Sequence, residues 1–266
     1  MANSAVLVLA CTIVSAMGPA RGSAQEPAEP PKETSSTARA GSETLISPRE
    51  FAGNILRDHK PVFTFPWRAI HGEHWKPVLA VVAGTAALVV LDPHTEGYFH
   101  DRSTFSSYKT GPLRGRNTTL AVTLTPVVFY VAGAARHSTH SRNTGLLAAE
   151  AIVDTQILSF VMKHAVGRLT PSDIPPHGNL RDTWFKYKGT LTNGGGFPSG
   201  HAASAFAVAT VISDRYRQHR WVPVVAYGAA AFLALTRLPA QAHFPSDVFI
   251  GAALGYSISH FVVLGR

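Results

Sequence analysis

Two short stretches of this sequence combine residue types that can hold and attack a phosphate group. The first is Pro198-Ser199-Gly200-His201, and the second places Arg237, His243 and Asp247 in close succession. Lys163 lies upstream of both. Imidazoles, cations, a carboxylate and a glycine are the groups needed to bind a phosphate and to attack it with a histidine nitrogen. The two stretches therefore indicate a phosphate site.

The first stretch predicts the start of a helix, because it precedes an alanine-rich apolar segment. Ser199 is a natural N-cap. The first turn of a helix has unpaired N–H groups and a positive dipole end, which together bind phosphate. Gly200 lets an anion approach the backbone closely. The alternative is an ordinary capped helix that has His201 at its start.

The second stretch places His243 and Asp247 four residues apart, with Pro245 suited to the first turn of the last helix. A carboxylate one turn away can hold an imidazole in one tautomer and leave its other nitrogen free as a nucleophile. Arg237 can clamp phosphoryl oxygens. The alternative is a surface His–Asp pair beside an interfacial arginine, and Lys163 alone suits the end of a membrane helix.

The bulk composition limits the possible classes of protein. The chain has 266 residues, a net charge of +8 and one cysteine, Cys11, which excludes an internal disulfide and a thiolate metal site. The length allows one large domain or two small ones. Positive charge suits anionic partners, but no basic patch is interleaved with aromatic residues, so we expect no nucleic-acid partner.

The N-terminal third is organised differently from the rest. Residues 1–24 contain an apolar run, typical of a signal peptide or an N-terminal hydrophobic segment. Residues 25–47 are rich in Pro, Glu, Ser and Thr and are predicted to be a disordered linker. Residues 48–74 are predicted to be an amphipathic, interfacial segment or a short helix packed on the domain. The domain itself is predicted over residues 75–266.

Six apolar segments recur in that domain and predict an all-α, membrane-embedded bundle of about six helices. A soluble bundle with alanine-rich helices is the alternative. Glu150, Asp154 and Gln156 lie within the third segment and must face the interior or a wet cavity. Two polar connections, residues 169–197 and 237–246, follow the third and fifth segments, so they open on the same face. The segments are 77–91, 120–135, 144–162, 201–212, 222–235 and 248–264.

The chain resembles the type 2 phosphatidic acid phosphatase and vanadium haloperoxidase superfamily, in its bacterial membrane phosphatase branch. That family reads Lys-x6-Arg-Pro, then Pro-Ser-Gly-His, then Ser-Arg-x5-His-x3-Asp. Here the second motif is complete, and the third begins with Thr236 in place of serine. In the first motif Thr170 stands where the family has arginine, and Arg168 is the nearest possible substitute.

The resemblance implies a mechanism and assigns roles to the residues. His243 would attack phosphorus to form a phosphohistidine, Asp247 would orient it, and His201 would act as general acid and then base. Cofactors and metal ions are not expected, although vanadate could bind as a phosphate mimic, and no carboxylate-rich metal cluster is obvious. The groups expected to hold the phosphate oxygens are Lys163, Arg237, Ser199, Gly200 and Arg168.

The expected function is hydrolysis of a lipid phosphate monoester or an isoprenoid diphosphate among membrane lipids. The resemblance favours a multi-pass protein of a bacterial inner membrane with its site facing the periplasm. Four alternatives remain: a secreted non-specific acid phosphatase, a vanadate-dependent haloperoxidase, a weakened enzyme, or a non-catalytic membrane protein of the same fold.

Overall fold

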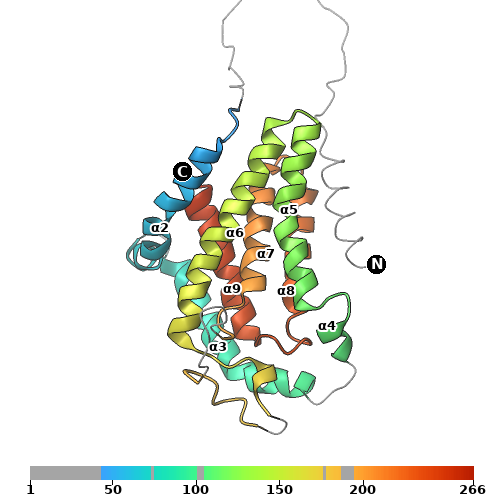
Figure 1. The fold of residues 1–266 in the computed structure, drawn as a ribbon. Helices are drawn as coiled ribbons and strands as arrows, with labels where there is room; N and C mark the ends of the chain where they lie inside the picture. The colour runs from blue at the N-terminus through green and yellow to red at the C-terminus, as the bar shows by residue number, and fades with distance from the viewer. Residues whose placement is uncertain (1–42, 73–74, 101–104, 176–177, 187–194) are drawn as a thin grey trace, which may run out of the picture.

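The computed structural model describes residues 43–72, 75–100, 105–175, 178–186 and 195–266. Within these ranges every regular element is a helix, and the long helices pack as a bundle (Figure 1). The all-α prediction is therefore confirmed. The apolar segment expected within residues 1–24 and most of the linker expected at 25–47 lie outside the described residues.

Five of the six predicted apolar segments lie within single helices, and the sixth, 248–264, covers most of the last α-helix and the π-helical turn that follows it. The bundle contains additional helices that are more polar or shorter. Among these, α2 begins with a capping box in which Ser47 Oγ accepts from Glu50 N–H and Ser47 N–H donates to Glu50 Oε2. The α-helices are α2 Pro48–His71, α3 Trp75–His100, α4 Ser106–Thr110, α5 Gly115–Ala135, α6 Thr139–Val166, α7 Gly200–Arg215, α8 Trp221–Leu235 and α9 Pro245–Ile258. A 3₁₀ turn, η2 Pro171–Asp173, and a π-helical turn, η3 Ser259–Val263, complete the described elements.

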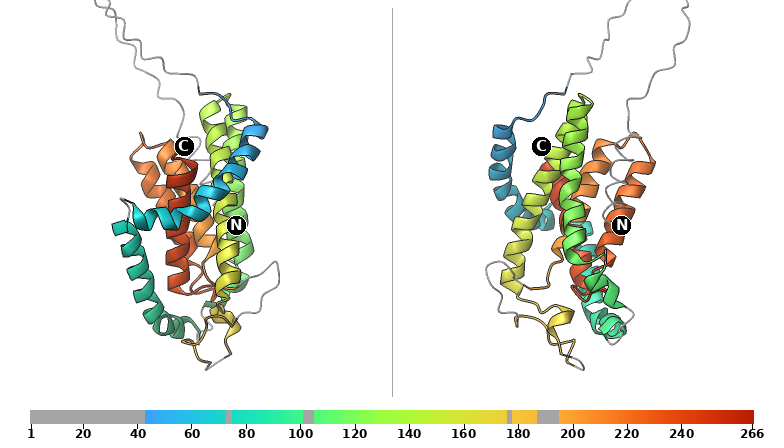
Figure 2. Two further views of the ribbon diagram at one scale, coloured as in Figure 1. Left: turned by 90° about the vertical axis from the view of Figure 1, so that its left-hand side faces the viewer. Right: turned by 45° about the vertical axis from the view of Figure 1, so that its right-hand side comes forward.

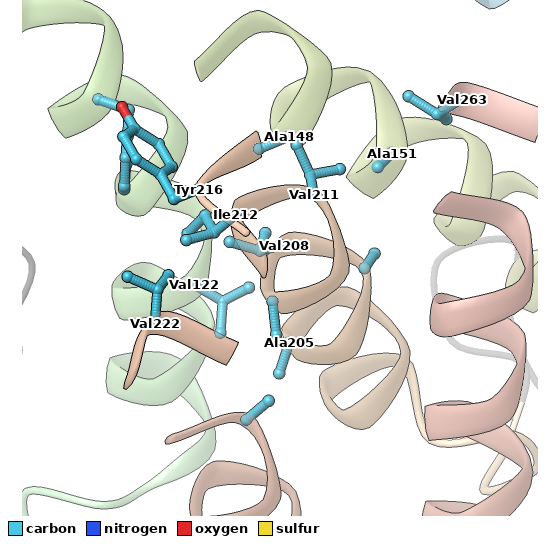
Figure 3. Packing of buried hydrophobic residues seen from close by; sticks show 14 residues of the cluster. Val122, Ala148, Ala151, Ala205, Val208, Val211, Ile212, Tyr216, Val222 and Val263 are labelled. Atoms are coloured by element: carbon cyan, nitrogen blue, oxygen red, sulfur yellow. The ribbon is translucent and has the colours of Figure 1, made fainter. Parts of the chain in front are cut away.

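Helix α7 is the centre of the bundle. Its small and branched side chains, such as Ala205 and Val208, are buried against side chains from the surrounding helices (Figure 3). Val122 comes from α5, Ala148 from α6 and Val222 from α8. A helix that is apolar on all sides is stable only when neighbours cover it all round, which explains the composition of α7.

Helices α7 and α9 approach closely because α9 has glycine at the contact. A Cβ atom on Gly251 would lie 2.5 Å from the carbonyl oxygen of Ser199, so a larger residue would force the helices apart. The contact aligns the starts of both helices, where Ser199 N–H donates to the carbonyl of Asp247 at 2.9 Å. Backbone packing thus joins the two stretches that carry the chemistry.

Within the residues that the structure describes, four helical segments are long and apolar enough to cross a membrane: Trp75–Phe99, Gly115–Ala135, Thr139–Asp173 and Pro245–Val263. Together they indicate a multi-pass membrane protein. The most apolar window of the first segment is only 6% buried, and α3 lies on the outside of the bundle beside α9 (Figure 2). The prediction that Glu150 and Asp154 face the interior is confirmed, since they are 0% and 2% exposed.

Candidate active site

The two polar connections meet at one end of the bundle, at the lower end in Figure 1, as their positions in the sequence predict. Lys163 at the end of α6 donates from Nζ to the carbonyl of Gly195 at 2.6 Å. His243 of the α8–α9 connection donates from Nδ1 to the carbonyl of Gly196 at 2.7 Å. The glycine segment before α7 therefore connects the lysine to the histidine.

A cavity of about 600 Å³ opens at this junction. Four of the predicted site residues line it: Lys163, Gly200, His201 and His243. The other four predicted residues are buried and are not part of the lining: Ser199, Arg237, Asp247 and Arg168. Polar side chains elsewhere in the lining belong to Thr119, Thr123, Gln156, Thr170, Ser172, Asp173 and Ser204.

The hydrogen bond to Gly196 fixes the tautomer of His243. A carbonyl oxygen can only accept, so Nδ1 carries the proton, and Nε2 of the neutral ring keeps its lone pair. The side chain is 7% exposed. His243 thus presents an unprotonated, positioned nitrogen at the cavity, as a nucleophile requires.

His201 lies opposite, with its ring centroid 6.3 Å from that of His243. Its Nε2 is 3.2 Å from the carbonyl of Gly115 and 2.8 Å from Thr119 Oγ1. The carbonyl again requires the proton on Nε2. Because Thr119 lines the cavity, this N–H lies at the cavity wall and can be offered to a bound oxygen atom.

Ser199 and Arg237 support the wall from behind. Ser199 Oγ accepts from Ala202 N–H at 3.4 Å, which makes it the N-cap of α7 and directs the helix start at the cavity. The Arg237 guanidinium donates to the carbonyl of Leu113 and to Thr236 Oγ1, and it is 1% exposed. Its charge lies next to His201, since both groups border Gly115.

Asp247 does not form the hydrogen bond to His243 that the spacing suggested. The nearest oxygen is 3.9 Å from Nδ1, because Oδ2 accepts from the Phe244 N–H at 2.8 Å and Oδ1 binds Arg168 at 2.5 Å. Asp247 therefore caps α9 and fixes the turn that carries His243. The direct partner of the imidazole is Gly196, which the sequence analysis did not single out.

Arg168 is turned away from the cavity that it was expected to reach. Its guanidinium is an ion-pair partner of Asp92 at 2.6 Å and of Asp247 at 2.5 Å, and it packs between the rings of Trp184 and Phe244. These ion pairs engage the positive charge of Arg168 in the protein interior, so the guanidinium does not contribute to the cavity. Thr170 does line the cavity, but its hydroxyl donates to Asp173 at 2.6 Å to cap η2.

Burial sets the protonation of both histidines. Burial, with the positive charge of Lys163 next in size, holds the pKa of His243 well below its usual value. Burial and then Arg237 lower the pKa of His201 to about 4. Both rings are consequently neutral at pH 7 in the empty site, so His201 lacks the proton that a leaving group needs.

We expect kcat/KM to be highest between about pH 4 and 6. Above the second pKa of a phosphate monoester, about 6, the substrate loses the proton that the neutral His201 cannot supply, so kcat/KM falls. Below about pH 4, His201 is itself protonated, so a further decrease in pH no longer raises kcat/KM. Initial rates from pH 4 to 9, with thermal unfolding measured at each pH as a control, test this. A maximum above pH 8 would contradict it.

Comparison with known proteins identifies the C-terminal half of the chain. Residues 144–266, which contain all eight predicted site residues, match the model of the PAP2 superfamily. The PAP2 domain is this matched stretch of residues 144–266, slightly less than half of the chain. Helices α6 to α9 of this PAP2 domain bring Lys163, His201 and His243 to the cavity, whereas α5, which supplies Thr119, precedes it.

Several relatives of the PAP2 domain are lipid A phosphatases. A lipid A 1-phosphatase of Rhizobium etli is 31% identical over 120 residues, which are 43% of this chain and 48% of that protein. A lipid A 4'-phosphatase of Bacteroides thetaiotaomicron is 33% identical over 100 residues, 38% of this chain and 43% of that protein. The aligned part thus spans less than half of each relative.

One solved structure is also similar, that of a transmembrane PAP2 type phosphatidylglycerolphosphate phosphatase from Bacillus subtilis. It is 20% identical, with a TM-score of 0.38 over 81% of this chain and 94% of that one.

Proposed function

We propose that this protein is a phosphatase that hydrolyses a lipid phosphate monoester through a phosphohistidine intermediate. The observation that carries the proposal is the pair of histidine rings, 6.3 Å apart on one cavity, with opposite hydrogen-bonding roles. A phosphoryl group bound between them would meet a lone pair on His243 and an N–H on His201. That is the arrangement needed for nucleophilic attack with acid catalysis.

In the first step His243 Nε2 forms a bond to phosphorus while the ester P–O bond breaks. The proton that a monoanionic substrate brings into the site first converts neutral His201 to the imidazolium. The leaving oxygen then takes the place of Thr119 as partner of His201 Nε2 and receives its proton, which leaves His201 neutral with a lone pair on Nε2. In the second step His201 removes a proton from water, the water oxygen bonds to phosphorus, and the N–P bond breaks. Inorganic phosphate leaves, and His243 returns to its neutral form.

The phosphoryl oxygens would be held by groups already at the cavity. Lys163 supplies a cationic donor, and the first turn of α7 supplies the Gly200 amide and a positive dipole end. Arg237 adds positive charge from behind the wall. Thr170 occupies the position where an arginine was expected, and Arg168 does not take over its role. With one phosphate-binding cation fewer, we predict a modest turnover. The route needs no metal ion or organic cofactor, and vanadate would inhibit it by occupying the phosphate position.

The substrate we favour is lipid A phosphorylated at the 1 or the 4' position, because relatives of the PAP2 domain bear those activities in their names. Four candidate membrane spans suit a substrate whose charged head reaches the site while its tails stay in lipid. We infer a bacterial inner membrane location, with the cavity facing the periplasm. An isoprenoid diphosphate is the second candidate, since it presents the same terminal phosphoryl group.

The test is phosphate release by the full chain, purified in detergent, from matched micelles of lipid A, phosphatidic acid and an isoprenoid diphosphate. Glucose 1-phosphate serves as the water-soluble comparison. We expect kcat/KM for a lipid substrate to exceed that for the sugar phosphate at least about tenfold. Equal rates would favour the non-specific phosphatase, and folded protein without any release would contradict the proposal.

A further inference from the structure

A second cluster of ionisable side chains lies outside the cavity lining. Asp58 of α2 meets Glu150 and Asp154 of α6, and one oxygen atom from each carboxylate lies within 4.8 Å of the others. All three side chains are buried, with 2%, 0% and 2% of their surface exposed. Figure 1 shows α2 beside the C-terminus, and Figure 2 shows it crossing the bundle next to α6.

The positive charge at this cluster does not balance the negative charge. Arg266 pairs with Glu150 and lies 3.5 Å from Asp58 Oδ2. Asn54 adds a neutral donor to Glu150 at 3.4 Å. With all three carboxylates ionised, the group carries a net charge of −2. Isolated charges buried in this way are strongly unfavourable, and they are found paired, neutralised by protons or bound to a cation.

The oxygen atoms themselves also point to a missing partner. Asp154 Oδ2 is buried and has no hydrogen-bond partner among the described residues, whereas Asp58 Oδ2 has only its ion pair with Arg266. Buried carboxylate oxygens normally accept hydrogen bonds or bind an ion. Asp154 is directed into the cluster, since one of its oxygens belongs to the group of three.

We propose that Asp58, Glu150 and Asp154 bind one divalent cation of the Ca²⁺ and Mg²⁺ class. Three carboxylates and no imidazole or thiolate form a donor set for a hard cation. A charge of +2 offsets the net −2 of the cluster. Ca²⁺ binds oxygen at about 2.3–2.6 Å, so ligands on opposite sides of it lie up to about 5 Å apart, compatible with the observed spacing.

The bound cation would join α2 to the PAP2 domain. Glu150 and Asp154 are one turn apart on the same face of α6, and Asp58 approaches from a helix that precedes the domain. Arg266 competes for the same oxygens, since it is held by two of the three ligands. Because the cluster links two helices outside the cavity lining, the ion would stabilise the fold, and its binding can be measured without any substrate.

The test is titration of the chelator-treated full chain in detergent with CaCl₂ and, separately, MgCl₂, followed by calorimetry and thermal unfolding. We expect one saturable site, and a rise in Tm of about 5–10 °C when the cation reaches 100 times its Kd. Absence of saturable binding by the wild type would overturn the proposal and would favour protonated carboxyl groups.

Three variants locate the site. Asp154→Asn and Asp58→Asn each remove a charged ligand at nearly constant size and should weaken binding at least about tenfold. Arg266→Gln removes the competing charge and should tighten binding. Asp182→Asn, an exposed aspartate paired with Lys186, is the matched control and should bind like the wild type. Unchanged affinity in both Asp154→Asn and Asp58→Asn would overturn the assignment.

Discussion

Replacement of His243 by alanine is expected to reduce kcat more than about 1,000-fold. Its Nε2 is the nitrogen that the Gly196 hydrogen bond leaves unprotonated at the cavity, and loss of a covalent nucleophile costs at least this much in comparable enzymes. The measurement is phosphate release by detergent-purified protein. His164→Ala, which removes an exposed histidine next to Lys163, is the matched control and should keep normal turnover.

A second experiment separates the nucleophile from the acid. With p-nitrophenyl phosphate the leaving group needs no proton, so His201→Ala should still be phosphorylated but should lose the base that activates water. We expect a burst of nitrophenol of about one equivalent, followed by slow turnover, and phosphate bound to His243. Activity surviving in His243→Ala, or a burst in that variant, would refute the mechanism.

Replacement of Arg168 by alanine is expected to lower the free energy of unfolding by about 3–5 kcal/mol. The substitution would leave Asp92 and Asp247 buried without their shared cation, and the uncompensated charge accounts for most of this cost. Thermal unfolding in detergent measures it. Arg181→Ala, at an exposed arginine of the same connection, should leave Tm nearly unchanged.

The same variant tests whether Arg168 contacts the substrate. A phosphate clamp would lose kcat/KM while Tm stayed constant, whereas a structural ion pair loses both. Arg168→Met combined with Asp92→Asn removes both charges of one pair, and we expect it to recover part of the stability lost in Arg168→Met alone. No recovery would argue against coupling of Arg168 to Asp92.

Four of the eight predicted site residues line the cavity, and the sequence could indicate these four because the motifs that contain them are local. Ser199 and Gly200 mark a helix start, and the apolar segments bring both connections to one end. The partners of these groups depend on long-range packing. Gly196 was one of several glycines in a polar loop, and only the fold shows that its carbonyl reaches His243.

The direction of Arg168 could not be deduced for the same reason. Asp92 follows an apolar run far upstream, and no spacing rule relates it to the first motif. The carboxylate cluster escaped detection because Asp58 lies on a mixed, charged helix, whereas Glu150 and Asp154 lie in an apolar one. A polar residue inside an apolar segment indicates that a partner exists, but it does not identify it.

The peripheral position of α3 makes the lipid environment part of the site. This helix carries Asp92, the partner of Arg168, yet nearly all of its apolar window faces outward, and it packs on α9 where Gly84 meets the ring of Phe249. We therefore expect lateral pressure from surrounding acyl chains to help keep this carboxylate against the turn that carries His243. We expect delipidation, or a bilayer of mismatched thickness, to loosen this anchor before the bundle itself unfolds.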